Sequence, residues 1–479
     1  MQGARTTLRN LRALRLALAF SLSVLGCSEQ RAAPNGHAGA GAASGGEAGT
    51  SAGAGASNAG GASGGEGARA GGGTGSGAVG ATGATGGDNG SGASGGGSGG
   101  GAAASAGNAG DSGASGNGGS TQGAFTHPGL LFVRADLERM RDRVSAGEEP
   151  YLGGWDRLRN EARASIDYTP TPFAIVTRSS GGTGEGNTEL RDDATRAFFH
   201  AVQWFVAEDR AHADKSAEIL NAWSGTLTAI EGDADRFLAA GLYGYLLANA
   251  GEILRHTYDG WSASDADRFE RMLVEIFYPL SHEFLETHAG SRVDHHFANW
   301  DAAQLVNIAS IGVFSDDRAM YDEAIDYFYN GAGNGNIMRA VYDGETGQLQ
   351  ESGRDQAHAQ LGIGLLASLC ETAWNQGDDL YSAADNRLLK GFEYTAQYLL
   401  GHEVPFTTYM DQSRTHTEIS PVNREQRRPI YEMVLNHYTN RRGVPAPFTA
   451  ELAGAIRPEG FHGDHPGFGT LLHTRPVTQ

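Results

Sequence analysis

Apolar residues recur every three or four positions along most of the chain after residue 134, the spacing of helices that bury one face. In the segment 134–147, Leu137, Met140 and Val144 fall on one such face. Further helices are predicted over 191–225 (as a pair), 234–258, 262–288, 299–317, 318–333, 382–401 and 427–443. Alternation of apolar and polar residues is scarce, and no strand–helix–strand rhythm appears. The pattern therefore predicts an all-α fold.

Short polar turns separate the predicted helices, so that successive helices should pack as antiparallel pairs. No repeat of fixed length is visible, which disfavours repeat arrays of the TPR kind. A closed or horseshoe-like ring of paired helices, an (α/α) toroid or incomplete barrel, fits best. We expect this region to span residues 125–479, long enough for one large domain or two smaller ones.

The first 27 residues have the parts of a secretory signal. Four arginines precede an apolar run from Leu16 to Leu25, which is too short for a stable membrane anchor. The run ends in Leu-Gly-Cys, which resembles the lipobox of bacterial lipoproteins, where the cysteine is lipidated. We therefore expect an exported protein that Cys27 anchors to the outer membrane or cell surface, or holds in the periplasm. The alternative is an ordinary signal peptide that happens to contain a cysteine.

Residues 28–124 consist almost wholly of glycine, alanine and serine. Such a segment cannot bury enough apolar surface to offset its conformational entropy, and we predict a disordered, flexible linker. The second cysteine, Cys370, lies in an apolar run. With Cys27 lipidated, no disulfide within the chain is expected.

The formal net charge of the chain is −20, and no basic stripe offsets it. We therefore expect no nucleic-acid partner. A local cationic cleft could still bind an acidic polymer. The sequence otherwise indicates a monomer without a cofactor.

One segment, QESGRDQAHAQLGIG at 350–364, crowds charged residues before a strongly apolar run. Arg354 and His358 are four positions apart and share a helix face, with Glu351 one turn before Arg354. Glu351 and Asp355 also share a face. A solvated first turn would carry such ion pairs without any function. The closeness of His358 to the apolar run, and the glycines around it, favour a packed catalytic face.

A second segment, VDHHFANWDAAQL at 293–305, places Asn299 and Trp300 at a predicted helix start. Asn299 could be a simple N-cap, and Trp300 a core anchor. The adjacent His295 and His296 point in different directions and lack the spacing of a zinc motif, so we expect no metal site.

A third segment, RRPIYEMVLNHY at 427–438, mixes Arg428 and His437 with Tyr431 and Tyr438. Tyr431 could also be a core aromatic residue whose hydroxyl is hydrogen-bonded.

Together, several segments resemble the alginate-lyase-like polysaccharide lyases of the (α/α)-toroid superfamily. They include HPGLLFVRADLERMRDRV, NWDAAQLVNIASIGVFSDD, GQLQESGRDQAHAQLGIG and DHPGFGTLL. The resemblance extends over essentially all of 125–479. It implies cleavage of a uronic-acid polysaccharide, such as alginate or glucuronan, by β-elimination, with this acidic polysaccharide as the partner.

The resemblance also implies roles for particular residues. Asn299 and Arg354 would stabilise the charge on the uronate carboxylate, and His358 would take the proton from C5. Relatives often carry a catalytic tyrosine soon after the arginine, where this chain has Leu361. Tyr431 is the first candidate for the acid, and its rivals are Tyr438, Tyr409 and Tyr394. The predicted substrate-binding residues are Trp300, His296, Glu351, Asp355, Arg428, Tyr438 and His437.

Two other functions remain open at this point. An (α/α)-barrel glycoside hydrolase would need two carboxylates, for which the chain offers Asp294, Asp301, Glu351 and Asp355. A non-catalytic glycan-binding surface lipoprotein would need none.

Overall fold

The computed structural model describes residues 123–412 and 414–476. The expected signal segment and almost all of the expected linker lie outside the described residues. The helices of the ring are α2 (Arg134–Ser145), α3 (Tyr151–Arg159), α4 (Asn187–Ala207), α5 (Arg210–Thr226), α6 (Asp235–Thr257), α7 (Ala263–Met272), α8 (Tyr278–Thr287), α9 (Ala298–Phe314), α10 (Arg318–Asn330), α11 (Ile337–Ala340), α12 (Gln356–Asn375), α13 (Ala383–Leu399), α14 (Tyr431–Leu435), α15 (Pro447–Ile456) and α16 (Gly469–Leu472).

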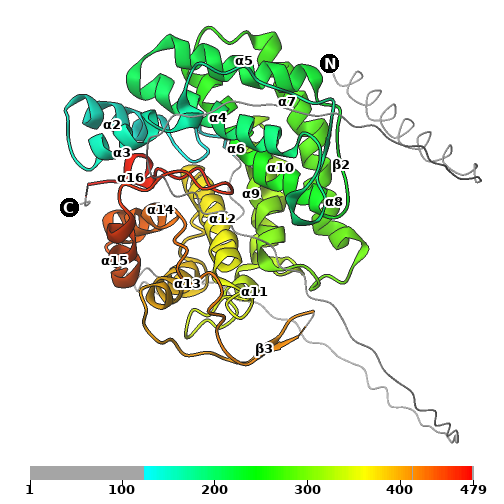
Figure 1. Ribbon diagram of the computed structural model, residues 1–479, viewed down its shortest axis with the longest axis vertical. Coiled ribbons are helices and arrows are strands. Elements are labelled where there is room, and N and C mark those ends of the chain that lie inside the picture. Colours follow the sequence, from blue (N-terminus) through cyan, green and yellow to red (C-terminus); the bar gives the residue numbers. More distant parts are fainter. Residues whose placement is uncertain (1–122, 413, 477–479) are drawn as a thin grey trace, which may run out of the picture. The chain divides into compact units, whose positions relative to one another are not determined.

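Successive helix pairs build a ring (Figure 1). The inner helices α4, α6, α9, α12 and α14 each pack against the next, while α5, α8, α10, α13 and α15 pack on them as outer partners. At the end of the chain, α16 contacts α3 and α2, so the C-terminal segment lies beside the first helices. The predicted (α/α) toroid is therefore confirmed.

The inner helices α6 and α9 form the centre of the hydrophobic core, because nearly all of their residues are buried. Among the described residues, α6 is the one helix long and apolar enough to cross a membrane. Its whole apolar stretch is buried within the domain. Its composition is thus accounted for by packing in the ring.

Helix α12 begins later than the sequence suggested. Asp355 is extended (φ −170°, ψ 162°), and its side chain accepts a hydrogen bond from the backbone N–H of His358, the geometry of an N-cap. Glu351 and Arg354 lie in the turn before the helix. The prediction that Arg354 and His358 share a helix face is therefore wrong. The helix begins only after Asp355, so Arg354 lies outside it.

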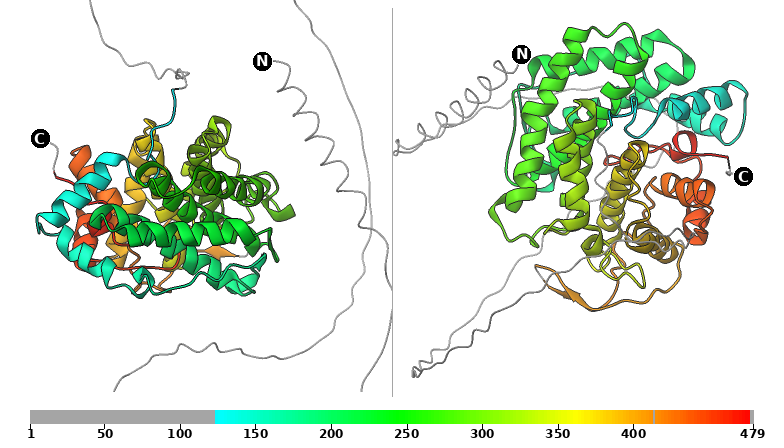
Figure 2. Two further views of the ribbon diagram at one scale, coloured as in Figure 1. Left: turned by 90° about the horizontal axis from the view of Figure 1, so that it is seen from above. Right: turned by 180° about the vertical axis from the view of Figure 1, so that it is seen from behind.

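Four short strands complete the part of the fold that the structure describes. The strands β1 (Ile175–Thr177) and β2 (Ala229–Glu231) pair in parallel, and β3 (Tyr409–Met410) pairs antiparallel with β4 (Thr415–His416). The β3–β4 hairpin projects from the rim of the ring in both the front and rear views (Figures 1 and 2).

Candidate active site

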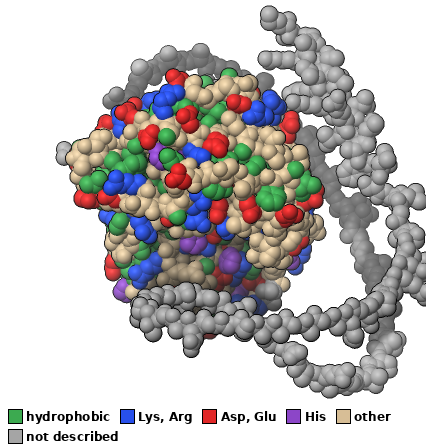
Figure 3. Space-filling model, turned by 45° about the horizontal axis from the view of Figure 1, so that its top comes forward, with side chains coloured by type: hydrophobic (Ala, Val, Ile, Leu, Met, Phe, Trp, Pro, Cys, Tyr) green, Lys and Arg blue, Asp and Glu red, His purple; other side chains and the backbone are tan. Residues whose placement is uncertain are grey.

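A cavity of about 390 Å³ opens between the inner helices α6, α9 and α12 and the loops facing them. The polar residues that line it are Arg178, Asp235, Asn299, Arg354, His358, Arg428 and Asp464, beside Trp300 and several apolar side chains. In the view of Figure 3, the described surface is hollowed in its lower half, and histidine and basic side chains gather there. Three arginines against two aspartates give the cavity lining an excess of positive charge, on a chain that is acidic as a whole.

His358 is held at the cavity wall by Asp355. The Asp355 carboxylate accepts the His358 backbone N–H at 2.8 Å and contacts ring Nδ1 at 2.7 Å. Burial opposes ionisation of Asp355, but its bonds to His358 and the charges of His358 and Arg354 lower its pKa to about 2. An ionised carboxylate only accepts hydrogen bonds, so Nδ1 must carry a proton. In the neutral ring Nε2 then has a free lone pair, and it makes no hydrogen bond with a described residue.

Asn299 and Arg354 meet at the buried carboxylate of Glu351. The side-chain N–H group of Asn299 donates to both carboxylate oxygens, at 2.9 and 2.8 Å, and Arg354 Nη1 donates to Oε2 at 2.8 Å. Burial raises the pKa of Glu351, although Arg354 and Asn299 act in the opposite direction. The amide of Asn299 is thus bound to Glu351, and the arginines supply the positive charge of the cavity.

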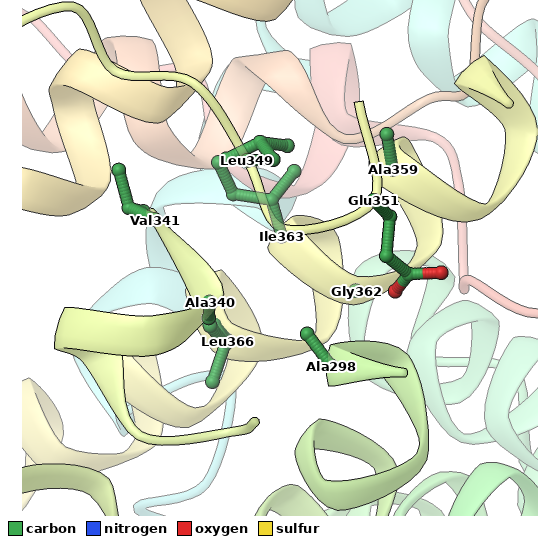
Figure 4. Close-up of a pocket in the computed structure, with 9 residues that line it drawn as sticks. All are labelled: Ala298, Ala340, Val341, Leu349, Glu351, Ala359, Gly362, Ile363 and Leu366. Carbon is green, nitrogen blue, oxygen red and sulfur yellow. The ribbon is translucent and has the colours of Figure 1, made fainter. Parts of the chain in front are cut away.

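Gly362 of α12 allows this close approach. A Cβ atom there would lie 3.2 Å from Glu351 Oε1 and 3.3 Å from the Asn299 backbone nitrogen. Figure 4 shows the Glu351 carboxylate next to Gly362, in a small pocket whose other lining residues are apolar. The glycine therefore has the packing role that the sequence indicated.

Two of the cavity arginines retain donors that have no hydrogen-bond partner. Arg178 Nη1 donates to the Tyr243 hydroxyl at 2.9 Å, and Arg428 Nη1 donates to Asp464 at 2.7 Å. The Nε atoms of Arg178 and Arg428 are buried and unpaired within the described part of the chain. An anionic ligand would satisfy such donors.

Trp300 lines the cavity and packs against His296, with ring centroids 4.5 Å apart. His296 itself does not line the cavity, nor do Glu351 and Asp355. These three predicted substrate-binding residues support neighbours that do reach it.

The aromatic candidates of the third segment lie in the core. The Tyr431 hydroxyl donates to Gln360 Oε1 at 3.0 Å, and the Tyr438 hydroxyl donates to the Tyr381 carbonyl at 2.6 Å. The His437 ring stacks on Tyr381 with centroids 3.6 Å apart. Their assignments as acid or substrate ligands are corrected, because burial and internal hydrogen bonds keep all three from the cavity.

The remaining tyrosine candidates do not reach the cavity either. The buried Tyr394 donates to the Pro405 carbonyl at 2.8 Å, and Tyr409 lines a different cavity. No tyrosine is among the described residues that line the site of His358.

The carboxylates considered for a hydrolase are not placed as a flanking pair. Asp301 is buried and accepts the backbone N–H of Gly335 at 2.7 Å. Asp294 lines another cavity, while Glu351 and Asp355 are bound to the site residues described above. None of these four carboxylates lines the cavity of His358, so the candidates taken from the sequence do not supply the flanking pair of a hydrolase.

One group in the described part of the chain has the composition of a metal site. Suitable atoms of His127, Glu252 and His256 lie within 4.8 Å of one another. However, the two imidazole rings are stacked at 4.5 Å and 14°, so their in-plane lone pairs cannot converge on one ion. The group instead fixes the first residues of the domain to α6.

Sequence reasoning missed Arg178, Asp235 and Asp464 as cavity residues. The signal for Arg178 was the glycine-rich stretch that follows it, of which Gly181 and Gly182 line the cavity. Asp464 lies in the DHPGFG segment, which was noted only for its resemblance.

Comparisons with known proteins identify a family model and a shared fold. Residues 177–406 match the family model described as alginate lyase. The fold resembles alginate lyase A1-III from Sphingomonas species A1, with 16% identity and a TM-score of 0.51 over 71% of this chain and 95% of that chain. A variant of alginate lyase A1-III complexed with a tetrasaccharide gives 15% identity and a TM-score of 0.53 over 76% and 100%.

An alginate lyase from Bacteroides ovatus matches at 9% identity with a TM-score of 0.50, over 73% of this chain and all of that one. At these identities the solved structures show a shared fold. No curated protein sequence matches the chain.

Proposed function

The chain belongs to the alginate-lyase-like family of polysaccharide lyases, and on this basis we propose that it cleaves a uronic-acid polysaccharide of the alginate or glucuronan type by β-elimination. The observation that carries the proposal is the meeting of three arginines and one carboxylate-bound histidine in a single cavity. The arginines make the cavity positive, whereas the chain as a whole is negative. A positive cavity fits an anionic polymer.

In the proposed mechanism, Arg354, Arg178 and Arg428 bind the uronate carboxylates and stabilise the charge that develops as C5 loses its proton. His358 Nε2 takes that proton. The electron pair forms the C4=C5 double bond, and the bond between C4 and the bridging O4 breaks. The protonated His358 then donates the proton to the departing oxygen. Asp355 holds the ring throughout, and Asn299 and Glu351 position Arg354.

Because one group serves as base and acid, it must reach H5 and O4 from the same face of the sugar. This geometry is syn elimination. It suits uronates with an equatorial O4, such as mannuronate and glucuronate, and disfavours guluronate, whose H5 and O4 are both axial and opposed. We therefore propose the first group as substrates.

We also propose that the protein is exported and anchored through Cys27. The support is the sequence alone: a positive region, a short apolar run and a lipobox-like cysteine. Radiolabelled palmitate incorporated into the wild-type chain, and absent from a Cys27→Ser variant, would test the anchor.

The test of the reaction is incubation of the purified protein with polymannuronate, polyguluronate, glucuronan, hyaluronan and chondroitin. We expect new ultraviolet absorbance from unsaturated uronate ends with polymannuronate or glucuronan. New reducing ends without that absorbance would indicate a hydrolase, and binding without any product would indicate a glycan-binding protein. Either result would refute the proposal.

A further inference from the structure

A second cavity, of about 370 Å³, lies beside the first. Its walls come from the loop before α9, from α11 and the residues after it, and from the β3–β4 hairpin. The side chains relevant to binding are Arg292, Arg339, Tyr342, Gln350 and Tyr409. None of these is used in the proposed chemistry.

Tyr342 offers a surface for a sugar ring, and the buried Tyr409 packs beside it. Tyr342 is 43% exposed, and its ring lies 5.3 Å from that of Tyr409 at an angle of 40°. Met410, which also lines the cavity, is 77% exposed. Large apolar side chains that remain exposed around a hollow are typical of binding sites.

The cavity also contains a cation available to a carboxylate. The Arg339 side chain makes no hydrogen bond or ion pair with any described residue. Arg292 binds Asp294 through two bonds of 2.9 Å, and both residues are exposed to solvent. An aromatic face beside a guanidinium that has no hydrogen-bond partner among the described residues matches a uronate residue, which has an apolar ring face and a carboxylate.

One short segment of backbone connects the two cavities. Gln350 lines the second cavity, and its side-chain oxygen accepts the backbone N–H of Ala298 at 3.1 Å. The next residue, Asn299, lines the first cavity, as does Arg354 at the other end of the turn that starts at Gln350. The turn 350–354 thus has the cleavage site on one side and the second cavity on the other.

We propose that the second cavity binds uronate residues of the same polysaccharide chain, away from the bond that is cleaved. This inference rests on the proposed function. The hairpin lies beyond the residues 177–406 that match the family model, so Tyr409 and Met410 belong to a part of this chain that the match does not cover. The cavity therefore gives a preference for longer substrates.

The first experiment compares kinetics on mannuronate or glucuronate oligosaccharides of increasing length. For Tyr342→Ala and Arg339→Ala, we expect KM for hexasaccharides and polymer to rise about five- to tenfold, the loss of one stacking or charged contact. KM for trisaccharides and kcat should stay as in the wild type. Tyr329→Ala is the matched control, because Tyr329 is 42% exposed and does not line either cavity.

The second experiment measures binding without turnover, by calorimetry of hexasaccharide binding to His358→Gln with and without Tyr342→Ala. A weaker complex in the double variant supports the inference. Equal affinities, or a rise in KM that is the same for short and long substrates, overturn it. Failure of the proposed function is a separate outcome, recognised by the lack of unsaturated product from the wild-type protein on every polymer.

Discussion

Asp355 holds His358 at two points: its carboxylate accepts the His358 backbone N–H at 2.8 Å and lies 2.7 Å from ring Nδ1. The same side chain thus ends the turn before α12, caps the helix, and fixes a proton on His358 Nδ1. Structure and proposed chemistry depend on one carboxylate.

These two roles can be separated by substitution. His358→Gln should lower kcat by about a thousandfold, the usual contribution of a general base that also acts as an acid. Asp355→Asn keeps a capping side chain but loses the negative charge, so kcat should fall while the unfolding free energy changes little. Asp355→Ala should lower kcat and also cost about 1 kcal/mol of stability. Steady-state kinetics and urea unfolding measure the two effects. An Asp355→Asn enzyme with wild-type kcat would contradict the positioning role.

Arg178 should contribute to substrate affinity. Arg178→Ala removes one of the cavity cations, and we expect KM to rise about tenfold, the loss of one charge-assisted contact. Arg178→Lys should recover part of this loss. Arg159→Ala is the control, because Arg159 is an exposed arginine paired with Asp156 outside the cavity. If KM rose equally in both alanine variants, general charge rather than the site would be responsible.

Two helical glycines should respond oppositely to the same substitution. Gly454 in α15 has open space around it, so Gly454→Ala should stabilise the protein by about 0.5–1 kcal/mol. At Gly362 the added methyl would press on Glu351 and the start of α9. Gly362→Ala should therefore gain no stability and should lower kcat by displacing Asn299 and Arg354. A thermal melt and a kcat measurement on each variant test this. Equal gains in stability would show that the contact at Gly362 is not tight.

Stability should decrease in mild acid. Burial lowers the pKa of His437 and His473 to about 3. The unfolded chain therefore takes up protons below about pH 6.5 that the folded chain does not, and the unfolding free energy falls by about 1 kcal/mol per pH unit for each ring. The loss should continue as the pH approaches 3.

Urea unfolding at several pH values between about 7 and 5 measures this slope. His473→Gln should reduce by about one the number of protons that the chain takes up on unfolding. A His473→Gln variant with the wild-type slope would mean that this ring is protonated in the folded state.

Much of the fold could be predicted from sequence because helices are local. The three- to four-residue spacing of apolar positions places α4, α6, α9 and α13 within a few residues of their observed bounds. The sequence also points to the Asn299–Trp300 and Glu351–His358 segments, because charged and polar residues directly beside apolar helical runs are unusual.

The site itself was decided by contacts between residues far apart in the chain. The hydrogen bonds of Asn299 to Glu351 and of Tyr431 to Gln360 join positions separated by 52 and 71 residues, and no local pattern encodes them. Only the tertiary structure brings Arg178 and Arg428 beside His358 and buries Tyr431, because which face of a helix meets the cavity depends on how the whole ring packs. The sequence by itself determined the helices and the residue types of the site, and their packing decided which of those residues reach the substrate.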